Sequence, residues 1–213
     1  MIGGQVGDMV LWPLGGFVIC GPVDSVIADF KVAIAGPLTH LPQMAFWLVI
    51  FFCIEGSMAG LDRIVDTSAH SFGAILSAQA FFLNLILFVF NLFVPAFPLD
   101  GGRCLAASLV TCGLSVLRAA LATALVGIFI AVVIMIMGMI EFFKGSPNGI
   151  FTAAIGAWIF MSSFDLFRAT RPASGVYGDI VTDKLSSHPV FGQKCYQDRA
   201  KAYAANNAAA NKV

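Results

Sequence analysis

Long apolar stretches separated by short polar breaks dominate the sequence. At about 1.5 Å of rise per helical residue, a stretch of about 20 residues crosses a hydrocarbon core of about 30 Å. Four stretches come near this length, namely residues 32–54, 74–94, 119–143 and 150–167. A further piece at 104–117, rich in small residues, is placed to continue the second stretch after a break. The pattern predicts an all-α, polytopic transmembrane helical bundle of about four to five membrane segments.

The first stretch is unlike a plain membrane helix in its early turns. Gly36, Pro37, His40 and Pro42 interrupt its apolar run. Proline removes a backbone donor and bends a helix, and a polar side chain at membrane depth needs a protein partner. We therefore expect a kinked segment that packs on protein rather than on lipid.

A short apolar and aromatic run, LWPLGGFVI, precedes this stretch at residues 11–19. It is too short to cross a bilayer and fits a short extended segment near the membrane surface. A strand there would offer an edge that can pair with another chain. A buried turn without a recognition role fits the run equally well, so both interpretations stay open.

The composition supports the membrane assignment. Apolar residues make up 59% of the chain and charged residues 11%, which leaves more apolar surface than a soluble domain of this size could bury. We therefore expect an integral, multi-pass membrane protein whose first partner is the lipid bilayer; the organelle is not indicated. The formal net charge of zero gives no indication of a nucleic-acid partner. The five cysteines lack CxxC spacing, so they predict neither a disulfide framework nor a cysteine metal site.

The end of the chain differs from the rest in composition. From residue 169 onward it is polar, and seven of the 12 Lys and Arg residues lie at or after Arg168. We divide the chain into a transmembrane domain at 1–168 and a polar C-terminal tail at 169–213. By the positive-inside tendency, the tail lies in the cytosol or its topological equivalent.

Candidate chemistry centres on Asp100, which follows an apolar run directly. An acid at the bilayer centre costs roughly 2.5 to 3.5 kcal/mol on insertion scales, so it normally pairs, faces a protein interior or binds an ion. Pro95 and Pro98 cannot continue a helical ladder, and Gly101 and Gly102 relax the backbone, so we expect the chain to unwind around the acid. Unwound backbone at that depth survives only against protein or a water-filled cavity. A solvated cap at an interfacial helix end is the alternative.

The other polar candidates are weaker. We interpret His40 as a histidine hydrogen-bonded between helices rather than a metal ligand, and Glu55 as a helix-end charge. His70 and His188 fall in polar segments and are expected at the surface. Arg103 either pairs with Asp100 or extends towards the interface, and we favour the second interpretation.

Three segments in this order, LWPLGGF, AIAGPLTH and NLFVPAFPLDGGR, resemble the site-2 protease family of intramembrane zinc metalloproteases, the M50 peptidases. The resemblance covers about residues 5–140. It implies that Asp100 is a zinc ligand and that Asn91 and Pro95 help to arrange a substrate strand. It also implies zinc as cofactor and a transmembrane protein as substrate.

One departure from the family is decisive for activity. The family's H-E-x-x-H helix places two zinc ligands one turn apart with a general base between them. The 213 residues contain no such motif, so they hold neither the catalytic glutamate nor two of the three zinc ligands. We expect a fragment that lacks the N-terminal catalytic helix and is inactive alone. One carboxylate cannot hold zinc usefully.

Two other function classes remain open. A non-catalytic relative could bind membrane proteins without cutting them. A small transporter component could use Asp100 as an ion or proton site. Transporters commonly show corresponding broken helices in two halves, whereas this sequence shows one such break.

Overall fold

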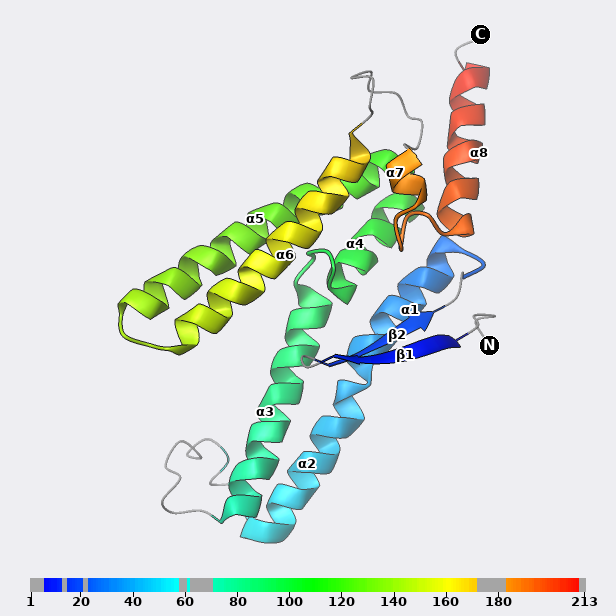
Figure 1. The fold of residues 1–213 in the computed structure, drawn as a ribbon. Helices are drawn as coiled ribbons and strands as arrows, with labels where there is room; N and C mark the ends of the chain where they lie inside the picture. The colour runs from blue at the N-terminus through cyan, green and yellow to red at the C-terminus, as the bar shows by residue number, and fades with distance from the viewer. Residues whose placement is uncertain are drawn as a thin grey trace.

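The computed structural model describes residues 6–12, 15–20, 23–57, 61, 71–171 and 183–210. It shows a helical membrane bundle preceded by a β-hairpin (Figure 1). Four helical segments of the described chain are long and apolar enough to cross a membrane: Val26–Glu55, Phe72–Phe93, Val116–Phe143 and Asn148–Thr170. The predicted fold class is thereby confirmed.

The first candidate span consists of two helices that meet at Thr39. Helix α1 (Val26–Leu38) begins at Ser25, whose hydroxyl accepts a hydrogen bond from the backbone N–H of Ala28. Helix α2 (His40–Glu55) follows directly. Pro37 lies in the last turn of α1, and the Thr39 hydroxyl donates to the carbonyl oxygen of Gly36 at 2.7 Å. The expected interruption of this span is confirmed.

The second span is helix α3 (Phe72–Phe93), which runs back alongside α2 (Figure 1). A non-helical connection at 94–99 follows it, and helix α4 (Asp100–Thr111) begins at the acid itself. The expectation that Gly101 and Gly102 belong to the unwound backbone is wrong, because both are helical. Their lack of a side chain serves packing instead: a Cβ on Gly102 would lie 2.6 Å from the backbone of Ala96.

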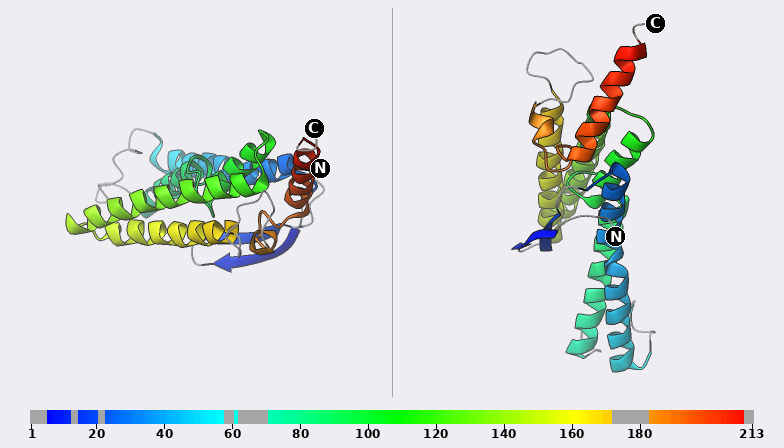
Figure 2. Two further views of the ribbon diagram at one scale, coloured as in Figure 1. Left: turned by 90° about the horizontal axis from the view of Figure 1, so that it is seen from above. Right: turned by 90° about the vertical axis from the view of Figure 1, so that its right-hand side faces the viewer.

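Helices α5 (Val116–Phe143) and α6 (Asn148–Thr170) form a long hairpin, and they lie side by side in both views of Figure 2. Glycines allow the two backbones to approach closely. A Cβ on Gly156 of α6 would lie 2.8 Å from the backbone nitrogen of Met135 on α5. Small residues at such contacts are typical of membrane helix pairs, since apolar side chains gain little by leaving lipid.

The outward faces of the spans carry large apolar side chains. Phe72 is 81% exposed, Phe129 70% and Phe143 78%. Because an aqueous surface does not tolerate so many exposed rings, these faces fit a lipid environment.

Part of the polar tail packs into the main core. Helix α7 (Asp183–Ser186) and helix α8 (Lys194–Ala210) belong to residues 183–210, which we call the C-terminal segment. Leu185, Phe191 and Tyr196 are fully or almost fully buried in one cluster with residues of α1, α4 and α5. The C-terminal segment therefore contributes to the fold despite its polar composition.

The described residues of the run at 11–19 fit the extended interpretation rather than the buried turn, and they belong to two strands. Strand β1 (Val6–Trp12) pairs antiparallel with strand β2 (Gly15–Cys20), with Leu11 opposite Gly16. Each strand thus has one partner within the chain.

The close contact between α5 and α6 yields a first prediction. Gly156→Leu forces a side chain into the backbone of α5, whereas Ala154→Leu adds the same side chain to an exposed position two residues away. We expect Gly156→Leu to destabilise the detergent-purified protein by about 1–3 kcal/mol, the usual range for overpacking. Thermal unfolding followed by tryptophan fluorescence measures the difference. Equal melting temperatures for the two variants would refute the packing role of Gly156.

Candidate functional site

Asp100 opens helix α4 at a point where α4 meets α1. Acids in the first turn of a helix are stabilised by the free N–H groups and the dipole of that turn. Its carboxylate lies against Gly36 of α1: a Cβ on that glycine would be 2.8 Å from Oδ2 of Asp100. The side chain is 30% exposed. Gly36 thus provides the space that the carboxylate fills.

This contact places the acid beside the first candidate membrane span. Gly36 lies ten residues beyond Val26, the first residue of the candidate span. At 1.5 Å per residue this is about 15 Å along this 30-residue candidate span. Asp100 therefore combines features of both sequence-based interpretations, since it begins a helix and lies against another span.

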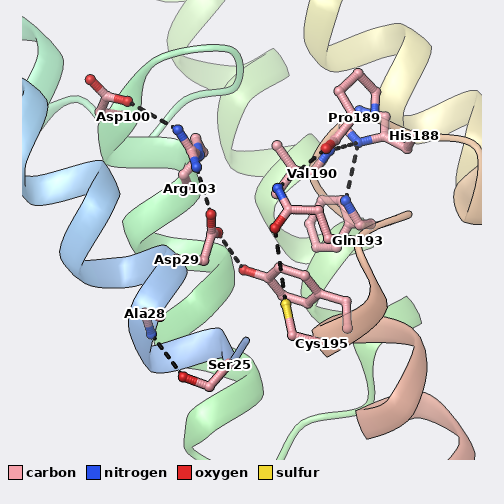
Figure 3. Close-up of polar contacts among 12 residues, drawn as sticks. Ser25, Ala28, Asp29, Asp100, Arg103, His188, Pro189, Val190, Gln193 and Cys195 are labelled. Atoms are coloured by element: carbon pink, nitrogen blue, oxygen red, sulfur yellow. Dashed lines mark hydrogen bonds and ion pairs between the residues drawn. The ribbon is translucent and has the colours of Figure 1, made fainter. Parts of the chain in front are cut away.

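A buried network lies one helical turn along α4 from the acid (Figure 3). Arg103 donates through Nη2 to Oδ1 of Asp29 at 2.5 Å, and Asp29 on α1 is completely buried. The hydroxyl of Tyr196, from the C-terminal segment, donates to Oδ2 of the same carboxylate at 2.9 Å. Both carboxylate oxygens of Asp29 are thus paired. The interpretation of Arg103 as extending towards the interface is wrong, because a buried aspartate needs a compensating charge.

Arg103 interacts more weakly with Asp100 than with Asp29. Its Nη1 lies 3.8 Å from Oδ1 of Asp100, beyond hydrogen-bond distance, whereas its bond to Asp29 is short. The guanidinium therefore satisfies Asp29 first and leaves the Asp100 carboxylate without a close donor from this side chain. The sequence pattern did not single out Asp29. The available signal was an acid at the start of an apolar stretch together with an arginine in the DGGR motif.

Tyr196 is tuned by its surroundings. Burial of the phenol, and secondarily the negative charge of Asp29, raise the pKa of Tyr196 well above its usual range. The hydroxyl stays protonated and remains a donor at any physiological pH. Ionisation of Tyr196 therefore does not break its hydrogen bond to Asp29 at physiological pH.

The connection at 94–99 is held by several parts of the chain. Ser163 of α6 donates its hydroxyl proton to the carbonyl oxygen of Phe97 at 2.8 Å. The ring of His188 packs on the Phe97 ring with centroids 5.0 Å apart. The backbone of this connection lacks regular helical hydrogen bonds. Contacts with other parts of the protein thus satisfy or cover its polar groups.

His188 is not an ordinary surface residue, contrary to the sequence-based expectation. Its ring also packs on Phe191, and its Nδ1 accepts a hydrogen bond from the backbone N–H of Val190 at 3.2 Å. Burial among these groups lowers the pKa of His188 to about 4. The neutral ring is thus part of the packed C-terminal segment. His70 lies outside the described residues.

His40 is confirmed as an interhelical hydrogen-bonding residue. Its Nδ1 lies 2.8 Å from Oδ1 of Asn84 on α3, and the Asn84 amide nitrogen donates to the carbonyl oxygen of Ala80. The Asn84 oxygen is therefore the acceptor, and His40 donates. This bond links α2 to α3 in the apolar bundle.

Asn91 and Pro95 lie close before the acid in the chain. Asn91 is in the last turn of α3, and Pro95 is in the connection at 94–99; both are partly buried. Their predicted part in binding a substrate strand stays a prediction.

The described residues supply one carboxylate to a metal site and no complete site. Within residues 23–57, 71–171 and 183–210, no three His, Cys, Asp or Glu side chains form a group that could hold a metal ion. Asp100 is partly exposed and has no close donor from Arg103. It therefore fits the part of a single oxygen ligand, the type that zinc accepts beside histidine nitrogens.

These features define a membrane protein with an acid held between apolar helices. The chain is 32% identical over 192 residues to a protein named "Putative zinc metalloprotease Rip3" in two strains of Mycobacterium tuberculosis, Erdman and H37Rv. The alignment covers 88% of this chain and 45% of the relative, so the chain spans less than half the length of the relative. No family model and no solved structure matches the chain.

The buried network predicts how the C-terminal segment is fastened. Tyr196→Phe leaves one oxygen of the buried Asp29 without its donor, which costs about 1.5–3 kcal/mol for a bond to a charged group. We expect amide hydrogen exchange in residues 185–200 to accelerate about tenfold or more. Tyr203→Phe on α8 is the matched control, because the Tyr203 hydroxyl makes no hydrogen bond to a described residue. Equal exchange in both variants would exclude the fastening role.

His188 predicts a dependence of the same docking on pH. The docked ring has a pKa of about 4, and a free histidine has about 6.5. Between these values only the undocked segment binds the proton, so docking is most stable above pH 6.5 and weakens as the pH falls to 4. The change is at most roughly 3 kcal/mol. Hydrogen exchange of residues 185–200 at several pH values, after correction for intrinsic rates, measures it, and His188→Gln should flatten the profile. A profile unchanged by this substitution would contradict the prediction.

Proposed function

We propose that this chain is part of a multi-pass intramembrane zinc metalloprotease of the site-2 protease (M50) family, which hydrolyses peptide bonds of transmembrane proteins. The observation that supports the proposal is the position of Asp100: the acid of the PLDGG motif begins α4 with its carboxylate against Gly36 of α1, within the first candidate membrane span. The relative named as a zinc metalloprotease supports the same class of chemistry.

In this proposal the chain contributes one zinc ligand, Asp100. The two histidines and the general base belong to the family's H-E-x-x-H motif, which the 213 residues do not contain. The activity is therefore proposed for the protein in which these residues are combined with that motif. Zinc, when bound, supplies a Lewis acid that polarises the scissile carbonyl and activates water.

The buried network keeps the Asp100 carboxylate available in this proposal. Arg103 is close enough to neutralise Asp100, but Asp29 holds the guanidinium at the shorter distance. Tyr196 fixes the other oxygen of Asp29. Asp29 is thus proposed as a positioning residue that prevents Arg103 from occupying the oxygen that a metal ion needs.

Asn91 and Pro95 are proposed to contact the substrate. Both lie within ten residues before Asp100, at the end of α3 and in the connection that precedes the acid. Because proline has no backbone N–H, a carbonyl group one turn earlier lacks its helical hydrogen bond. Backbone with such unpaired groups can pair with an extended peptide. Cleavage requires an extended peptide near the zinc ligand, and this connection lies directly before Asp100 in the chain.

A second candidate is a non-catalytic membrane protein that binds other membrane proteins. The observation that favours it is the lack of a metal-holding group of three side chains among the described residues. It predicts that Asp100 is dispensable for partner binding and that the intact gene product cuts no substrate.

The test of the proposed function uses the intact gene product in membranes. Asp100→Ala should lose stoichiometric zinc and lose cleavage of a transmembrane substrate, because the coordination sphere lacks its third ligand. Asp24→Ala removes an exposed acid just before α1 and should change neither. Wild-type cleavage by Asp100→Ala would exclude Asp100 as a ligand. Absence of zinc and cleavage in the wild type would favour the non-catalytic candidate.

The positioning role of Asp29 needs a rescue experiment. Asp29→Asn preserves shape and the acceptor for Tyr196 but releases Arg103, which should close on Asp100 and weaken zinc binding about tenfold or more. Adding Arg103→Met removes the competing cation and should restore zinc binding. If Asp29→Asn weakened zinc binding only by disturbing the fold, a second buried substitution would not restore zinc binding. Equally weak binding in the single and double variants would therefore disprove the role.

A further inference from the structure

A cavity of about 840 Å³ lies where the last turns of α6 meet α7, apart from the site around Asp100. Three cationic side chains, one carboxylate and two phenyl rings line it: Arg168, Arg171, Lys184, Asp165, Phe164 and Phe167. None of these side chains has been given a role above. The excess of positive over negative charge predicts an anionic ligand.

Aromatic rings orient the two arginines. The guanidinium carbon of Arg168 lies 5.2 Å from the centre of the Phe164 ring, and that of Arg171 lies 4.7 Å from the centre of the Phe167 ring. These distances fit cation–π contacts, which hold a guanidinium face against a ring and leave its N–H edge free. The rings thus restrict two flexible side chains before any ligand binds.

Among the described residues, no ion-pair partner is seen for the three cations. The ion pairs of Arg103 with Asp29 and Asp100 do not involve Arg168, Arg171 or Lys184. Among the described residues that line the cavity, Asp165 is the single carboxylate. A ligand with negative charge would therefore gain attraction without displacing an existing partner.

The cavity lies at the end of a membrane span. Arg168 and Ala169 are in the last turn of α6, which is the candidate span Asn148–Thr170, and Lys184 belongs to the polar C-terminal segment. Below the cavity, Ile155, Trp158 and Met161 of α6 are between 44% and 59% exposed. The helix thus exposes apolar side chains along its surface and cationic side chains at its end. This arrangement suits a lipid, which has an apolar acyl chain and a charged headgroup.

We propose that this cavity binds the phosphate headgroup of an anionic phospholipid. Arg168 and Arg171 would bind the phosphate oxygens with paired N–H donors, a geometry that guanidinium matches well. Lys184 adds a third charge, and Asp165 accepts hydrogen bonds from headgroup hydroxyls. The acyl chains run along the exposed face of α6. Basic pockets beside membrane helices on the cytoplasmic side are suited to such headgroups.

The test compares lipid retention by native mass spectrometry after reconstitution in mixed zwitterionic and anionic lipids. The wild type should retain one anionic phospholipid, and Arg168→Gln/Arg171→Gln should bind it about tenfold or more weakly. Lys194→Gln/Lys201→Gln removes the same charge from exposed positions on α8 and should bind like the wild type. Equal losses in the two double variants would show diffuse charge attraction and overturn the site.

Two further arms separate the remaining outcomes. Arg168→Lys/Arg171→Lys keeps both charges and should recover part of the affinity; failure of this variant to exceed the glutamine pair would count against phosphate recognition. Inorganic phosphate at millimolar concentration should not displace the lipid, because it lacks the apolar contacts with α6. Displacement by phosphate alone would overturn the lipid assignment in favour of a free-phosphate site. Neither arm depends on protease activity.

Discussion

The burial of the Asp29 carboxylate is the constraint on which the arrangement of this protein depends. A charge with no exposure to solvent must be compensated, and here an arginine and a phenol supply the two partners. Those partners come from α4 and from the C-terminal segment. One carboxylate therefore joins three parts of the chain that differ widely in composition.

The same pairing governs the chemistry available to Asp100. A guanidinium within 4 Å of both acids cannot bind both equally, and the complete burial of Asp29 decides the competition. Asp100 keeps partial exposure and faces Gly36 of α1. The close pairing of Arg103 with Asp29 and its longer contact with Asp100 thus have the same cause.

Packing around the connection at 94–99 shows how irregular backbone is tolerated within a membrane bundle. Ser163 accounts for the carbonyl of Phe97, His188 covers its ring, and Gly102 allows α4 to approach the backbone of Ala96. Each of these contacts comes from a different element. The connection is therefore fixed by the fold around it. Substitutions in α6 or in the C-terminal segment should change the conformation of the backbone next to Asp100.

The sequence by itself determined the features that depend on local order. Apolar runs of sufficient length gave the four candidate spans, Pro37 marked the broken first span, and Pro95 and Pro98 marked the connection before Asp100. It misjudged Gly101 and Gly102, because glycine serves both loops and close helix contacts. Only the tertiary structure decided the partners of Arg103 and the burial of Asp29 and His188. Arg103 and Tyr196 lie 74 and 167 residues from Asp29 along the chain, and at such separations local hydrophobic patterns carry no information about which polar groups pair.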